Sequence, residues 1–151
     1  MTGPSYRFRL ERVRALRERA EDAAKQAFAT AVHERLRSEL ALEEAALRVA
    51  HAREAQLDAT SQATSAGELL ARQAYLERSE HFQQASQEEL GRREQALEQR
   101  RDELTEAARE RQALERLKEH RRLEHQREQA RIEALALDEI AINGFRRRAA
   151  A

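Results

Sequence analysis

Apolar residues recur every seven positions in the second half of the chain. The series runs Leu69, Leu76, Gln83, Leu90, Leu97 and Leu104, and only Gln83 is polar. Seven residues make almost two turns of an α-helix, so these side chains form one narrow stripe of the kind that packs against a partner helix. The ladder predicts a coiled-coil helix over about 67–143. The Asn143-Gly144 pair can end it, because both residues tolerate a left-handed C-cap.

The first half is helical in pattern but has fewer large apolar residues. Its expected inward stripe starts as Phe8, Val13, Leu16, Ala20, Ala23, Ala27 and Phe28, then changes phase and resumes as Leu36, Leu40, Leu47, Ala50 and Leu57. A phase change alters the supercoil without ending the helix. The pattern therefore predicts one helix over about 6–58, with Ser5 as a candidate N-cap.

Short hydroxyl side chains concentrate between the two helical patterns, over residues 58–67. Such side chains compete for backbone hydrogen bonds and favour turns, so we expect the bend here. Ser65 and Glu68 fit a capping box at the start of the second helix. The predicted fold class is all-α: an antiparallel two-helix coiled-coil hairpin with a longer second helix, a single domain over 1–151 with a basic tail at 144–151.

The unequal helix lengths leave apolar residues without an internal partner. If Leu57 lies opposite roughly Leu69, antiparallel pairing puts Phe8 opposite about Leu117 or Lys118. Farther along lie Leu123, Ile132, Leu135, Leu137, Ile140, Ile142 and Phe145. An exposed apolar cluster of this kind indicates an interaction site. Two alternatives stay open: the tip pairs with a second copy, or the first helix is offset and covers part of the cluster.

Arginines are also numerous at the end that holds both termini. They are Arg7, Arg9, Arg12, Arg14, Arg17 and Arg19 on the first helix, facing Arg116, Arg121, Arg122, Arg127 and Arg131 with Lys118, and Arg146 to Arg148 beyond. We expect a basic end, with the compensating acid nearer the bend. The alternative is that these arginines pair with glutamates at helical spacing, as in Glu124 with Arg127 or Glu128 with Arg131.

Composition narrows the function classes. Charged residues make up 37% of the 151 residues, aromatics only 4%, and there is no cysteine. These values suit a solvated helix rather than an enzyme with a compact core, and they exclude disulfides and thiolate metal sites. The five histidines lack metal-ligand spacing, and no phosphate loop or catalytic constellation is present. We expect no enzyme activity, no metal, no cofactor and no small-molecule substrate. Alternating charge signs disfavour nucleic-acid binding, and the absence of a leader or apolar span indicates a cytosolic protein.

Both ends of the chain carry recognisable residue patterns. The opening stretch runs from Phe8 through Leu10, Val13 and Leu16 to Glu18. The closing pattern is Leu117-Lys118-Glu119, then Glu128, Glu133 and Leu137-Asp138-Glu139-Ile140-Ala141 with Phe145 and Arg146. These patterns resemble the N-terminal and C-terminal signatures of the FliJ family, the coiled-coil subunit of the bacterial flagellar type III export apparatus.

The resemblance implies a non-enzymatic stalk whose termini end inserts into the hexameric export ATPase. The implied ring contacts are Phe8, Arg12, Leu123, Ile132, Leu135, Leu137, Asp138, Glu139, Ile140 and Phe145. Other implied partners are export chaperones and the cytoplasmic part of the membrane export gate, which places the protein at the cytoplasmic face of the membrane. Leu69, Tyr75 and Leu76 are the expected gate contact, with packing against the first helix as the alternative for Tyr75 and Phe82. Two other functions stay open: the equivalent stalk of a virulence injectisome, and a homo-oligomeric scaffold.

Overall fold

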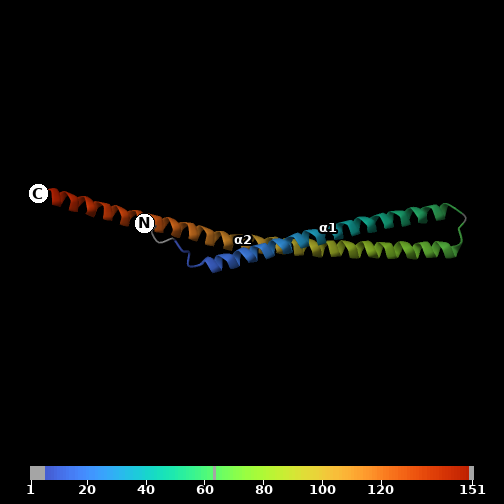
Figure 1. The fold of residues 1–151 in the computed structure, drawn as a ribbon. Helices are drawn as coiled ribbons and strands as arrows, with labels where there is room; N and C mark the ends of the chain where they lie inside the picture. Colours follow the sequence, from blue (N-terminus) through green and yellow to red (C-terminus); the bar gives the residue numbers. More distant parts are fainter. Residues whose placement is uncertain (1–5, 63, 150–151) are drawn as a thin grey trace. The chain divides into compact units, whose positions relative to one another are not determined.

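The computed structural model describes residues 6–62 and 64–149. Two helices make up its secondary structure there: α1 over Glu11–Ser61 and α2 over Ala66–Ala149 (Figure 1). The helices pack antiparallel, as shown by ion pairs such as Arg53 with Glu80 and Arg93 with Glu34, in which the partner number falls as the α1 number rises. The predicted all-α helical hairpin is confirmed.

The chain divides into two compact units. The hairpin unit is Asp22–Glu106 and contains the bend, whereas the termini unit combines Met1–Glu21 with Ala107–Ala151. Each unit therefore takes one segment from α1 and one from α2.

Small side chains line the contact between the helices in the hairpin unit. The buried apolar residues of α1 here are Ala31, Ala45, Val49, Ala52 and Ala59, with relative exposures of 1–7%. Opposite them, the leucine ladder of α2 is half-buried from Leu69 to Leu104. The ladder thus faces α1 as expected. Ser79, three residues after Leu76, is also buried and donates its hydroxyl to the Tyr75 carbonyl at 2.9 Å.

The stripe predicted for the first helix is wrong over most of its length. Leu36, Leu40, Leu47 and Leu57 are 44%, 60%, 60% and 68% exposed, and Val13 and Leu16 are 41% and 62% exposed. Ala20, Ala23 and Ala50 are exposed as well. The physical reason is that the residues at 31, 45, 52 and 59 keep a strict seven-residue spacing without a phase change, and alanine lets two helices approach closely.

The bend is shorter than predicted. α1 continues to Ser61 and α2 starts at Ala66, so the hydroxyl residues from 58 to 61 lie inside a helix. Thr60 and Ser61 donate their hydroxyls to the carbonyls of Leu57 and Asp58, at 2.7 and 2.8 Å, and so satisfy the last turn rather than breaking it. Ser65 is an N-cap as expected, since its Oγ accepts the Glu68 amide at 3.3 Å.

The register agrees with the expected one to within one helical turn. In the hairpin unit, where pairing of Leu57 with about Leu69 was predicted, Arg72 donates to the Ala55 carbonyl at 3.1 Å. In the termini unit, Phe8 and Leu117 line the same groove, as expected.

Both outer helix ends also differ from prediction. α1 starts at Glu11 rather than near residue 6, and the predicted cap Ser5 lies outside the described residues. Tyr6 and Phe8 instead pack beside α2, where the Tyr6 hydroxyl donates to the Lys118 carbonyl at 3.3 Å. α2 passes through Asn143 and Gly144 to Ala149, and no described residue has positive φ. Arg146 to Arg148 occupy the last turn and favour continuation, because cations stabilise a helix C-terminus.

Candidate interaction surfaces

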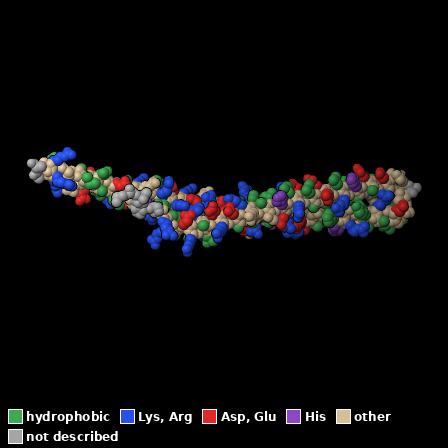
Figure 2. Space-filling model, viewed as in Figure 1, with side chains coloured by type: hydrophobic (Ala, Val, Ile, Leu, Met, Phe, Trp, Pro, Cys, Tyr) green, Lys and Arg blue, Asp and Glu red, His purple; other side chains and the backbone are tan. Residues whose placement is uncertain are grey.

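The end of α2, residues 126–149, is here called the C-terminal segment and carries most of the predicted ring contacts. Ile132, Leu135, Leu137, Ile140, Ile142 and Phe145 are 49–74% exposed, and Leu123 just before them is 40% exposed. Asp138 and Glu139 are exposed too. Figure 2 shows hydrophobic side chains on the surface of this segment. The sequence correctly predicted that these side chains lack cover from the described part of the chain.

α2 extends past the start of α1, because Glu11, the first residue of α1, already pairs with Lys118. Farther along α2, the ring centroid of His125 lies 5.7 Å from that of Tyr6, which precedes α1. Beyond it, the ion pair of Arg131 with Glu128 at 2.8 Å stays within one helical turn. Within residues 6–62 and 64–149, no hydrogen bond or ion pair joins the C-terminal segment to α1. An unpaired helix with large apolar side chains is the result.

The two predicted ring contacts near the N-terminus differ in accessibility. Arg12 is exposed, whereas Phe8 is only 9% exposed and holds the incoming chain to α2. A groove of about 630 Å³ runs between Tyr6–Leu10 and the α2 residues Leu117 and Arg121. Phe8 therefore contributes its side chain to the floor of a groove rather than to an exposed patch.

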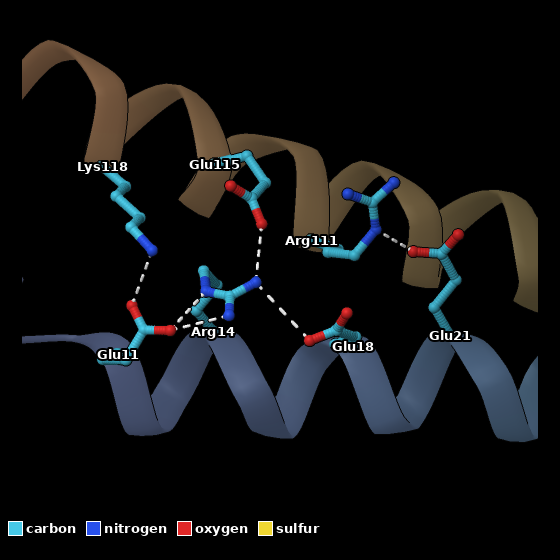
Figure 3. Close-up of polar contacts among 7 residues, drawn as sticks. All are labelled: Glu11, Arg14, Glu18, Glu21, Arg111, Glu115 and Lys118. Atoms are coloured by element: carbon cyan, nitrogen blue, oxygen red, sulfur yellow. Dashed lines mark hydrogen bonds and ion pairs between the residues drawn. The ribbon is translucent and has the colours of Figure 1, made fainter.

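A charged contact line joins α1 to α2 in the termini unit (Figure 3). Lys118 and Arg14 both donate to Glu11, Arg14 also reaches Glu115 at 2.8 Å, and Arg17 reaches Glu110 at 2.6 Å. The innermost pair joins Arg111 to Glu21, whose side chain is 7% exposed. We call these residues the charged seam, because they link α1 to α2 along the termini unit.

The charged seam corrects the picture of a uniformly basic end. Arg14 and Arg17 face glutamates of α2 rather than its arginines. Hydrogen bonds from Arg14 and then Lys118 lower the pKa of Glu11, and bonds to Glu11 and Glu115 raise the pKa of Arg14. On α2, each of Glu110, Arg111 and Glu115 therefore pairs with a side chain of opposite charge on α1.

Local pairing accounts for further arginines of the termini unit. Arg122 pairs with Glu119 and Arg131 with Glu128, each at 2.8 Å and three residues apart. The predicted pair of Glu128 with Arg131 is confirmed. Glu124 pairs with Arg121 at 3.0 Å instead of Arg127. For these side chains the alternative of helical pairing holds, and Figure 2 shows acidic and basic groups intermixed on the surface.

The three expected gate contacts lie on two faces of α2. Leu69 and Leu76 belong to the half-buried ladder, whereas Tyr75 is 48% exposed. Tyr75 lines a groove of about 310 Å³ together with His51, Ala52, Ala55, Ala71 and Arg72. Phe82, also 48% exposed, carries the Arg48 guanidinium 5.1 Å from its ring centre. Tyr75 is therefore the member of the set that is available to a partner.

The main surface missed at the sequence level is the outward leucine line of α1. The sequence contained the signal in its alanines, which repeat every seven residues beside the leucines. Because a buried leucine contributes more than a buried alanine, the pattern favours the leucines as the inward set, and the structure places the alanines there instead. Among the described residues, no His, Asp or Glu cluster could hold a metal ion, and neither described helix is apolar enough over sufficient length to cross a membrane.

Comparison with known proteins identifies the family of this chain. The family model described as flagellar FliJ protein matches residues 6–150, nearly the whole chain. No curated protein and no solved structure matches the chain. The matched range contains the bend, the contact between α1 and α2 in each unit, and the C-terminal segment. The chain therefore belongs to the FliJ family, and this membership makes it a component of the flagellar protein export apparatus.

Proposed function

We propose that this protein is the non-enzymatic stalk of the flagellar export apparatus. Its C-terminal segment inserts into the hexameric export ATPase and regulates it. The hairpin unit contacts the cytoplasmic part of the membrane export gate and the export chaperones, at the cytoplasmic face of the membrane. Family membership supports the apparatus, and the residues below support the assignment of each contact.

The exposure of the C-terminal segment is the observation that carries the proposal. Six large apolar side chains, at 132, 135, 137, 140, 142 and 145, are 49–74% exposed on one unpaired helix. Burial of such side chains in a partner is the main favourable contribution to most protein–protein association.

A ring pore suits this segment because its apolar residues do not form a single stripe. Leu135 and Leu137 lie two residues apart and point in directions that differ by about 200° around the helix. A groove covers only one face of a helix, whereas a pore surrounds it. Asp138 and Glu139 lie between these directions and provide charges that select the orientation inside the ring.

The gate contact rests on a smaller surface. Tyr75 is half-exposed beside a groove, and an aromatic side chain at such a place is a frequent binding hot spot. Leu69 and Leu76 act indirectly, because they hold the helix turn that presents Tyr75. We expect Tyr75→Ala to weaken gate binding and leave ATPase binding unchanged.

The test replaces Leu135, Leu137 and Ile140 with glutamine. We expect this variant to lose association with the purified export ATPase in a pull-down while its helical circular dichroism and thermal midpoint stay unchanged. Leu70→Gln is the matched control, since Leu70 is 71% exposed on the hairpin unit. Undiminished association of the triple variant would refute insertion of the C-terminal segment.

A further inference from the structure

The outward face of α1 in the hairpin unit carries its own line of apolar residues. We call it the outer leucine stripe: Leu36, Leu40, Leu47, Ala50 and Leu57. Leu47 is two residues from Ala45 and two from Val49, so it points about 200° around the helix from each of these buried residues. The stripe therefore lies opposite the contact with α2.

The stripe does not serve the hairpin itself. Its four leucines are 44–68% exposed, whereas the residues that α1 buries against α2 are mostly alanines. Apolar burial favours the reverse placement, because a buried leucine contributes more than a buried alanine. Four leucines on one exposed helix face indicate an interaction surface.

Acidic groups border the stripe from Leu40 to Leu57. Glu43, Glu54 and Asp58 are exposed, and within the described residues no hydrogen bond or ion pair occupies their carboxylates. Glu44 has one ion pair, a long one of 3.9 Å to Arg48. Arg48 in turn places its guanidinium over Phe82. By contrast, Glu39 on the side of α1 pairs with Arg35 at 3.3 Å.

We propose that the outer leucine stripe docks an amphipathic helix of another protein whose apolar residues are flanked by lysine or arginine. Such a helix buries the leucines and pairs its cations with Glu43, Glu54 and Asp58. A second copy of this chain is the poorer occupant, because it brings an equally acidic stripe. An anionic membrane surface is repelled for the same reason.

The test uses two synthetic helical peptides with the same leucine spacing, one flanked by lysines and the other by glutamates. Fluorescence anisotropy with the full chain should detect binding of the lysine peptide only, and added salt should weaken it. The double variant Leu40→Gln, Leu47→Gln should bind the lysine peptide about tenfold or more weakly. Leu70→Gln should bind it normally, and circular dichroism should show that each variant is helical.

Charge reversal makes the test specific. The variant Glu43→Lys, Glu54→Lys should bind the glutamate peptide in preference to the lysine peptide. A surface that binds by apolar contact alone would not show this switch. Unchanged peptide preference in this variant overturns the proposal. So does sedimentation that shows self-association lost on Leu40→Gln, Leu47→Gln. The variant at Leu135, Leu137 and Ile140 should bind the lysine peptide normally, so this proposal and the ATPase contact fail independently.

Discussion

Ion pairs join α1 to α2 in both the hairpin unit and the termini unit, but the side chains buried between the helices differ. In the hairpin unit, Ala45 and Ala52 of α1 are 1% and 5% exposed beside the half-buried leucines of α2. In the termini unit, Glu11, Arg14 and Glu21 reach Lys118, Glu115 and Arg111.

This difference separates stability from specificity. Apolar burial is non-directional and little affected by salt, so it stabilises the hairpin unit under most conditions. Charged pairs contribute less to stability, but each has a required partner position and therefore selects one register. The unit that holds the C-terminal segment is thus the one with the more conditional helix contact.

Breaking the alanine contact should have the largest effect. Ala45→Glu puts a carboxylate where the native residue is 1% exposed, and we expect a loss of about 3 kcal/mol or more in the free energy of unfolding. Leu47→Glu is the matched control, since Leu47 is 60% exposed and only two residues away. Urea unfolding followed by circular dichroism measures both. Equal midpoints for the two variants would show that α1 buries another face.

Breaking the charged seam should have a moderate and local effect. Glu21→Ala leaves Arg111 without its carboxylate in a part-buried place, so the amides of α1 near residue 21 should exchange hydrogen faster. Glu21→Leu combined with Arg111→Leu should restore slow exchange, because an apolar pair often replaces a buried ion pair without loss. If the double variant exchanges as fast as Glu21→Ala, the pair is needed for more than contact.

Acidification should loosen the termini unit before the hairpin unit. The folded-state pKa of Glu11 is lowered by its bonds from Arg14 and Lys118. The stabilisation from this carboxylate is therefore complete above its ordinary pKa and is lost as the pH falls through the lowered value. The pKa of Glu89 is also lowered, but its bonds come from Arg92 and Arg93 on the same helix. Hydrogen exchange from neutral to acidic pH should show earlier loss of protection at residues 11–21 than at 45–52.

Replacing single glycines of α2 by alanine should have the smallest effect on stability, and the effect should differ between the part of α2 that packs on α1 and the part that does not. Gly91→Ala meets no atom within 4 Å and should raise stability by about 0.5–1 kcal/mol, because alanine loses less backbone freedom in a helix. Gly144→Ala meets equally open space but lies in the C-terminal segment, which α1 does not cover. We expect it to increase helicity at the end of α2 without moving the unfolding midpoint. Equal midpoint shifts would mean that the segment unfolds together with the hairpin.

The seven-residue spacing of apolar residues predicted the inward face of α2 correctly. On α1 the prediction was wrong, because it depended on side-chain size. The ladder from Leu69 to Leu104 identified the inward face of α2, and Ser65 identified where that helix begins. On α1, leucines and alanines offered two stripes with similar spacing, and preference for the larger residue selected the exposed one. The pairing of Arg111 with Glu21 could not be predicted, because it depends on the exact register of the two helices, which a seven-residue pattern leaves open.

The exposure of the C-terminal segment was predictable, because the prediction needed only a difference in length between the two helices. The residue at which α2 ends was not predictable, since Asn143 and Gly144 can cap a helix without being required to do so. Propensity alone cannot decide between these outcomes when three arginines follow in the last turn.

The buried alanines of α1 determine which substitutions this protein tolerates. At residues 31, 45, 52 and 59 the limit is volume, since any larger side chain, even a greasy one such as valine or leucine, pushes two backbones apart. At residues 69, 76, 90 and 97 the limit is polarity, and methionine or isoleucine should be accepted. Accepted substitutions are thus limited by side-chain volume on α1 and by side-chain polarity on α2.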